Sequence, residues 1–206
     1  MTTLDRDMVP RPAPAGVDRL SARGTSSALL AMILFVASEA VFFAAFLGIY
    51  ANAFTNAEVW PPKEVPLPSL VLPTITVVAL VLSAITLGVP IRQVRQGRYS
   101  AGSIGWLAAT IVLAIAFVVL MVYGYRDVGY GIGDGVYESL FYVINGLALA
   151  HAVGGIFLFV LVLLRLRGAG PAAQREPVLV AGVYWYFVVA VGVIIYVLFD
   201  LAVMSS

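Results

Sequence analysis

Two ionisable side chains, Glu39 and His151, stand inside long apolar runs of the sequence. Glu39 lies 13 residues from either end of the run 26–52, and His151 lies 14 and 15 residues from the ends of 137–166. A charged, unpaired side chain at the centre of a membrane helix costs at least about 2.5–3.5 kcal/mol. If both runs cross a membrane, the two groups lie at the same depth, and we predict a direct or water-mediated hydrogen bond between them. In the alternative, Glu39 stays protonated against a backbone carbonyl and His151 packs separately.

Aromatic and small side chains accompany these two groups at helical spacing. Four phenylalanines share the face of Glu39: Phe35, Phe42, Phe43 and Phe46. Such a stripe packs against a neighbouring helix more often than it binds a cofactor. Small residues recur every four positions around His151, at Gly146, Ala150 and Gly154. Because this pattern permits close approach of another helix, we predict helix packing there.

A redox metal centre is not expected in this chain. The sequence has one His and no Cys, whereas haem and copper sites require several His, Cys or Met ligands in a set geometry. The lack of Cys also excludes disulfides, thiolate metal sites and thiol catalysis. The net charge of +1 suggests no nucleic-acid partner. We therefore predict no catalytic centre, no bound metal and no nucleic-acid role for this chain.

The elements that carry Glu39 and His151 are predicted to be membrane helices. Of the 206 residues, 62% are apolar and 11% are charged, and the mean hydropathy is +1.00. Soluble domains usually contain about 25% charged residues, so a surface this poor in charge requires lipid as its solvent. Residues 1–25 are rich in charge and proline and are expected to form a flexible cytoplasmic tail. The apolar run behind the tail is too long for a signal peptide, so we interpret it as a true membrane helix.

Five apolar runs are long enough to cross a hydrocarbon core of about 30 Å, which takes roughly 17–25 residues. They are residues 26–52, 69–91, 103–125, 137–166 and 177–204. Backbone polar groups in lipid must be satisfied within their own segment, and the runs show none of the alternation typical of membrane strands. We therefore predict an all-α fold, with a five-helix transmembrane domain over residues 26–206.

The distribution of basic residues predicts the orientation in the membrane. Ten of the twelve Lys and Arg residues lie in the tail and in the second and fourth connections, and only Lys63 and Arg126 lie in the first and third. Because Lys and Arg accumulate in cytoplasmic loops, we expect the N-terminus in the cytoplasm and the C-terminus on the opposite side. The bias alternates along the whole chain, which supports an odd number of spans.

Three further features receive ordinary structural interpretations. The alternating glycines of residues 129–135 follow no strand and lack the spacing of a phosphate-binding loop. Asp200, near the outer end of the last run, is expected to contact water or lipid headgroups. Four aromatic residues are candidates for lipid or interface contacts at the membrane surface: Trp60, Tyr184, Trp185 and Tyr186.

Five short motifs follow one another along the chain beyond the tail. They are residues 33–46 (ILFVASEAVFFAAF), Trp60-Pro61-Pro62, Leu72-Pro73-Thr74, Phe141-Tyr142 with His151 and Gly154-Gly155, and Tyr184-Trp185-Tyr186-Phe187-Val188. This ordered set resembles subunit III of the haem–copper oxidases. In that family the first motif carries a Ser-Glu-x-x-Phe-Phe signature, and the short bacterial form has five helices.

The chain departs from the family's pattern at four places. The first His of the family's fourth-helix segment is here Ala148, the His of its Y-W-H-F-V motif is Tyr186, and the acidic residue after that motif is Val189. The Gln…Glu-Tyr element near the end of the third helix is replaced by residues 123–126. These departures indicate a divergent branch.

The resemblance implies a non-catalytic subunit that packs against catalytic subunit I, beside subunit II, in a bacterial inner membrane. Haem and copper are then expected in the partner subunits, and phospholipid on this chain. Glu39 takes the position of the family's buried glutamate, which implies a role in proton uptake or helix docking, with His151 orienting it. An accessory subunit of a nitric oxide reductase is the alternative. A small membrane transporter is a further one, although the sequence shows no internal repeat.

Overall fold

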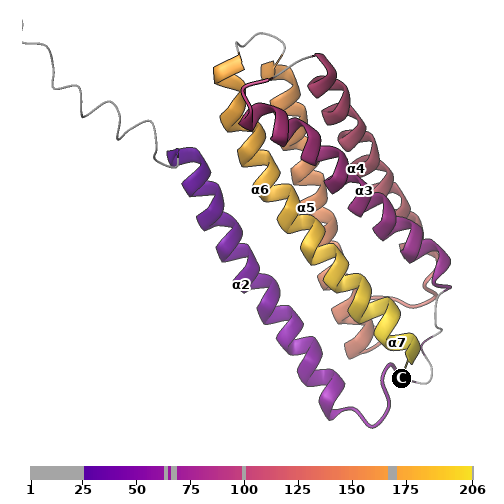
Figure 1. Ribbon diagram of the computed structural model, residues 1–206. Helices are drawn as coiled ribbons and strands as arrows, with labels where there is room; N and C mark the ends of the chain where they lie inside the picture. Colours follow the sequence, from indigo (N-terminus) through magenta and orange to yellow (C-terminus); the bar gives the residue numbers. More distant parts are fainter. Residues whose placement is uncertain (1–25, 63–64, 66–68, 99–100, 167–170, 206) are drawn as a thin grey trace, which may run out of the picture.

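The computed structural model describes residues 26–62, 65, 69–98, 101–166 and 171–205 (Figure 1). The expected tail of residues 1–25 lies outside this part of the chain. The described segments form the helices α2 (Ser27–Asn56), α3 (Val71–Arg95), α4 (Ala101–Asp127), α5 (Val136–Leu166) and α6 (Pro171–Tyr196). A π-helical segment, η1 (Val197–Leu201), joins α6 to the short α7 (Ala202–Ser205). No described residue lies in a strand, so the prediction of an all-α fold is confirmed.

Five of these helices are long and apolar enough to cross a membrane, as predicted. Several of the helix ends lie further out than the apolar runs predicted. The helix α2 continues to Asn56 instead of ending at residue 52, and α6 begins at Pro171 instead of residue 177. Hydropathy identifies the part of a helix that sits in hydrocarbon, whereas the backbone hydrogen bonds continue into polar turns beyond it. Proline is tolerated at the first position of a helix because that amide has no intrahelical partner.

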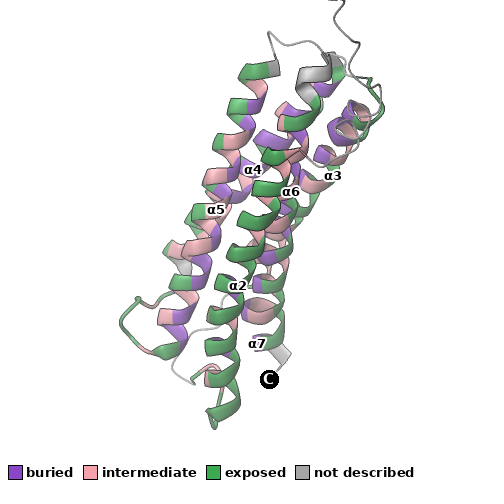
Figure 2. Ribbon diagram, turned by 90° about the vertical axis from the view of Figure 1, so that its left-hand side faces the viewer, coloured by how far each residue is buried: buried purple, intermediate pink, exposed green. Residues whose placement is uncertain are grey.

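The helices are arranged as a four-helix bundle of α3, α4, α5 and α6, with α2 lying beside α6 and α5 (Figure 1). Apolar side chains from all four bundle helices fill the interior, including Leu80, Leu107, Ala152 and Trp185. The helix α2 is the least covered element, because only Phe43 and Tyr50 on it are buried (Figure 2). The helix α2 therefore contacts the bundle along one stripe, and most of its surface is open.

The helices α5 and α6 approach closely at Gly155. A Cβ atom built on Gly155 would meet the Trp185 ring at 2.5 Å, and one on Gly154 would meet the Tyr184 hydroxyl at 3.1 Å. By contrast, a Cβ on Gly146 would have no neighbour within 4 Å, and Ala150 is exposed. Of the predicted packing residues Gly146, Ala150 and Gly154, Gly154 lies at this close approach to α6. For Gly146 and Ala150, helix packing stays a prediction.

The prediction that Tyr184 and Trp185 contact lipid headgroups is wrong. Both side chains are buried, and Trp185 is 0% exposed. The Trp185 Nε1 donates a 2.8 Å hydrogen bond to Ser83 Oγ on α3. Since the polar N–H is satisfied inside the bundle, this ring has no need of the membrane interface. Tyr186 on the same helix is 43% exposed, so its interface contact stays a prediction.

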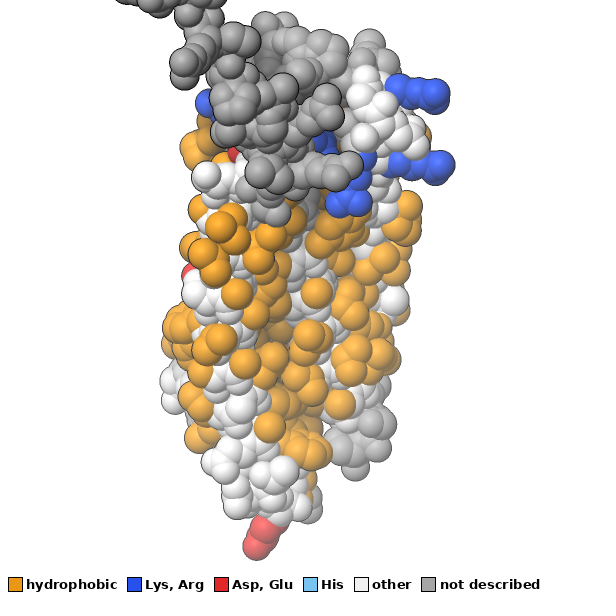
Figure 3. Space-filling view, turned by 60° about the vertical axis from the view of Figure 1, so that its left-hand side comes forward, with side chains coloured by type: hydrophobic (Ala, Val, Ile, Leu, Met, Phe, Trp, Pro, Cys, Tyr) orange, Lys and Arg blue, Asp and Glu red, His pale blue; other side chains and the backbone are white. Residues whose placement is uncertain are grey.

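The two ends of the bundle differ in charge. Five of the six arginines of the described part gather at the end where α3 and α5 finish and α6 begins (Figure 3): Arg92, Arg95, Arg98, Arg165 and Arg175. We call this the basic end. The opposite end carries one arginine, Arg126, together with Glu58, Asp134 and Glu138. The predicted orientation depends on this uneven distribution of charge between the two ends. The orientation itself stays a prediction.

An aromatic cluster closes the opposite end of the molecule. The Trp60 Nε1 donates to the Tyr50 hydroxyl at 3.1 Å, and that hydroxyl donates to Leu198 O at 3.0 Å. The rings of Tyr137 and Phe199 pack into the same cluster. Trp60 is thus half-buried between α2, α5 and η1, and its contact with lipid stays a prediction. Beside it, burial raises the pKa of the Tyr130 hydroxyl, which keeps this group neutral.

Candidate functional site

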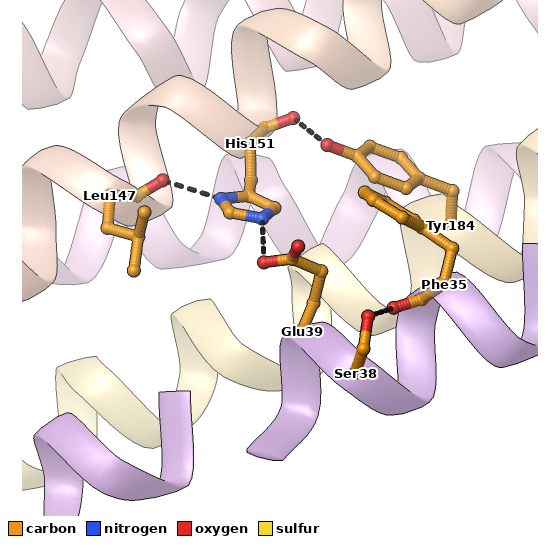
Figure 4. A network of polar contacts seen from close by, with 6 residues as sticks. All are labelled: Phe35, Ser38, Glu39, Leu147, His151 and Tyr184. Atoms are coloured by element: carbon orange, nitrogen blue, oxygen red, sulfur yellow. Dashed lines mark hydrogen bonds and ion pairs between the residues drawn. The ribbon is translucent and has the colours of Figure 1, made fainter. Parts of the chain in front are cut away.

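Glu39 and His151 meet between α2 and α5 (Figure 4). The His151 Nε2 lies 3.1 Å from Glu39 Oε2. The other ring nitrogen, Nδ1, lies 2.8 Å from the main-chain carbonyl of Leu147, one turn earlier on α5. The structure therefore brings together the two ionisable groups that the sequence places at the same depth.

The carbonyl of Leu147 determines where the protons of this pair lie. A carbonyl oxygen only accepts, so Nδ1 must carry a hydrogen; otherwise two lone pairs would face each other at 2.8 Å. One further proton then lies between Nε2 and the Glu39 carboxyl. Either the neutral carboxyl donates to Nε2, or the imidazolium donates to the carboxylate. The pair has zero net charge in both states, which suits its apolar surroundings.

The proton can move between the two atoms without charging the pair as a whole. The 3.1 Å separation of Nε2 and Oε2 is within hydrogen-bonding range, so no side chain has to rearrange for the transfer. The arrangement is chemically able to accept, hold or release one proton at a defined atom. Nothing in it provides a nucleophile next to a base for covalent catalysis.

Aromatic rings surround the pair on its protein side. The Phe43 ring lies edge-on to His151 with a centroid distance of 5.1 Å, and Phe187 of α6 lies at 6.2 Å. Phe35 stacks on Tyr184, whose hydroxyl donates to the carbonyl of His151 at 3.0 Å. These rings hold the imidazole in one orientation and exclude other polar partners from its faces.

The pair is only partly covered within this chain. The side chain of Glu39 is 23% exposed and that of His151 is 12% exposed. The exposure is on the α2 side, where neighbouring residues such as Val41 and Phe42 also face outward. A lipid chain or a partner helix placed against α2 would therefore complete the burial of the carboxyl.

Sequence reasoning identified the pair but missed two groups that position it. The carbonyl of Leu147 carries no sequence signal, because every residue has one. Tyr184 was assigned to the membrane interface, although its side chain lies against the deep residues Gly154 and His151. Tyr184 and Phe187 are three residues apart and share a helical face, which would have indicated packing of Tyr184 against a neighbouring helix.

Asp200 lies beside a cavity that the sequence did not predict. The structure half-buries it against this cavity, between α3, α4 and α5, and its contact with water or headgroups stays a prediction. The reason is the π-helical segment η1, which inserts an extra residue per turn and rotates the last part of the span. An ordinary helical pattern cannot reveal such a rotation.

Within the described residues, no cluster of three or more His, Cys, Asp or Glu side chains is available for a metal ion. The fold and the site together define an integral membrane protein of five helices whose central polar site is a carboxyl–imidazole pair. The family model for cytochrome c oxidase subunit III matches residues 6–202. The chain belongs to this family, as the ordered motifs indicated.

Individual relatives agree with the family. The chain is 31% identical over 173 residues to cytochrome c oxidase subunit 3 of Paracentrotus lividus, covering 81% of this chain and 66% of that protein. It is 27% identical over 188 residues to the protein of the same name in Alkalihalophilus pseudofirmus, covering 89% and 90%. The protein of that name in Synechocystis sp. is 26% identical over 172 residues, covering 82% and 73%. The chain thus spans about two thirds of the first relative and most of the second.

Proposed function

We propose that this chain is the non-catalytic subunit III of a haem–copper terminal oxidase in a bacterial inner membrane. In this role it stabilises catalytic subunit I beside subunit II, binds phospholipid and supports proton uptake during aerobic respiration. Haem and copper belong to the partner subunits. The support is the family match, the bacterial relatives and the Glu39–His151 pair, of which the pair carries the mechanistic part.

The helix α2 supplies the docking surface of this proposal. Its outward face carries large apolar side chains, including Leu34, Val41 and Ile49, of which Val41 is 72% exposed. A helix with only two buried residues gains little from its own bundle. Packing against a partner helix in the membrane would bring van der Waals contacts that the free chain lacks. Docking there would also seal the exposed part of Glu39.

Proton uptake is assigned to the pair because it stores one proton beside this docking surface. Its two states differ only in which atom, Nε2 or Oε2, carries the hydrogen. A partner subunit that seals the carboxyl would alter the balance between the states, since a dry environment disfavours separated charges. The pair therefore couples docking to local proton position.

Phospholipid binding is assigned to an open pocket near the basic end. The pocket has a volume of about 780 Å³ between α2, α5 and α6, with apolar walls that include Leu158, Leu161 and Val180. Arg165 and Glu176 stand among the lining residues. An acyl chain fits the apolar walls, while Arg165 offers a charge-assisted partner for a headgroup phosphate.

Purification of the chain with its partners tests the main proposal. We expect an affinity-tagged chain, extracted in a gentle detergent, to bring a haem-bearing catalytic subunit with it. The visible spectrum should show haem that is reduced by donor and reoxidised by oxygen, and mass spectrometry should identify subunits I and II. A colourless preparation from membranes that express these subunits would contradict the proposal, and reductase subunits in their place would favour the alternative.

The proton role is tested separately with Glu39→Gln. The amide can still donate to His151 Nε2, so docking should persist while the transferable proton is lost. We expect the purified complex to assemble normally but to lose activity faster during turnover. The matched control is Glu58→Gln, an exposed carboxyl at the opposite end. Unchanged proton uptake and turnover lifetime for Glu39→Gln would remove the proton role and leave the docking role standing.

A further inference from the structure

A second polar site lies inside the bundle, away from Glu39 and His151. It is a cavity of about 240 Å³ between α3, α4, α5 and the end of α6 with η1. Its deeper wall is apolar, with Phe117, Met121 and Ala148, and its outer part contains Asp200. For comparison, an apolar cavity of about 150 Å³ is large enough to bind benzene. The space is therefore sufficient for a small molecule.

The polar groups of this cavity have unused hydrogen-bonding capacity. No hydrogen bond or ion pair joins the Asp200 carboxyl to any described residue. Asn145 uses its Nδ2 to donate to Phe141 O, and its Oδ1 has no partner in the described part of the chain. The ring of Tyr125 lines the wall, and its buried hydroxyl is likewise without a partner. Buried polar groups are nearly always paired, so the Tyr125 hydroxyl requires an explanation, while the half-buried Asp200 carboxyl and Asn145 Oδ1 are available to a ligand in the cavity.

The backbone at Asp200 is unusual in a way that supports a binding role. In η1 the Ala202 amide donates to the Val197 carbonyl, five residues earlier, instead of four. Single π-helical turns of this kind occur frequently at functional sites. Here the turn carries the carboxyl to the cavity, where an uninterrupted α-helix would present a different face.

The chemistry of the lining selects the kind of ligand. The described lining residues include one carboxyl and no Lys, Arg or His, so an anionic head would meet an unpaired carboxylate. The available acceptors are Asp200 and Asn145 Oδ1, which can accept a hydrogen bond from a donating head. We propose that this cavity binds a small amphiphile with an apolar body and a hydrogen-bond-donating head, an alcohol or an amine. The inference does not rest on the oxidase proposal.

Photolabelling in membranes that contain the full chain tests this proposal. Three probes share an eight-carbon chain with a diazirine and differ only in the head: alcohol, amine or carboxylate. We expect the alcohol or the amine to label residues near Phe117 and Met121, and an excess of unmodified octanol or octylamine to suppress this labelling. The internal control is the lipid-facing side of α4 at Val112 and Val119, which are exposed and should label without saturation.

Variants then identify the groups that bind. Asp200→Ala should lower the suppressible labelling about fivefold, the ratio that one hydrogen bond contributes. Ala148→Leu should abolish it by filling the cavity, whereas Glu58→Ala, an exposed carboxyl, should leave it unchanged. Equal labelling by the carboxylate probe would overturn the choice of head, and labelling that no competitor suppresses would overturn the site. Both of these outcomes are measured on the chain without substitutions. The proposal can therefore be tested even if a variant fails to fold.

Discussion

The hydroxyl of Tyr184 donates a 3.0 Å hydrogen bond to the main-chain carbonyl of His151, and the two rings stack with centroids 6.3 Å apart. This contact joins α6 to the turn of α5 that positions the imidazole. Gly154 makes room for it, since a Cβ atom there would lie 3.1 Å from the tyrosine oxygen. The Glu39–His151 pair, which joins α2 and α5, is thus supported by Tyr184 of α6.

Removal of the Tyr184 hydroxyl should weaken this support. We expect Tyr184→Phe to lower the free energy of unfolding by about 0.5–1.5 kcal/mol, the net contribution of one hydrogen bond. Denaturant titration in detergent measures the change. The matched control is Tyr186→Phe on the same helix, whose hydroxyl is exposed and makes a longer bond of 3.4 Å. Equal effects of the two substitutions would contradict a supporting role for Tyr184.

Truncation of Glu39 should cost more than its replacement by an amide. Glu39→Ala leaves His151 Nε2 without a partner, and we expect a loss of about 1–3 kcal/mol in the free energy of unfolding. Glu39→Gln should cost less because the amide can still donate to Nε2. The neighbouring Ser38→Ala serves as the control, since that hydroxyl is exposed and bonds only to Phe35 O of its own helix. If Glu39→Ala and Glu39→Gln lower the free energy of unfolding equally, the hydrogen bond between Glu39 and His151 does not stabilise the fold.

Two glycines of α5 should respond differently to substitution by alanine. Gly155→Ala brings a methyl group to 2.5 Å from the Trp185 ring, so we expect a loss of about 1–3 kcal/mol through overpacking. Gly146→Ala meets nothing within 4 Å and replaces a poor helix former, so it should be neutral or stabilising by up to about 1 kcal/mol. Thermal unfolding of the two variants side by side measures the contrast. A harmless Gly155→Ala would show that α5 and α6 can separate without cost.

The lack of Cys in the sequence makes the predicted orientation directly measurable. Single cysteines are introduced as Gln96→Cys at the basic end and Glu58→Cys at the opposite end, both at exposed positions. In intact spheroplasts a membrane-impermeant maleimide should label Glu58→Cys at once. Gln96→Cys should be labelled only after lysis, because basic loops face the cytoplasm. The reverse pattern would invert the topology.

The overall architecture was predictable because one physical requirement dominates it. Apolar runs in lipid must be helical, so the five spans and the shared depth of Glu39 and His151 follow from hydropathy alone. The surroundings of the pair were not predictable in this way. Burial of Trp185 depends on Gly155 and Ser83, which lie far from it in sequence. Likewise, the position of Asp200 depends on a π-helical turn that leaves no mark on the hydrophobic pattern.

The distance along the chain between the two members of the pair has a consequence for biosynthesis. Glu39 precedes His151 by 112 residues, and α3 and α4 are made between them. At about 5–20 residues per second, synthesis of Glu39 precedes synthesis of His151 by about 6–22 s. During this interval α2 is completed without the final partner of its carboxyl. The contact between α2 and α5 therefore forms late, after α3 and α4 have been made.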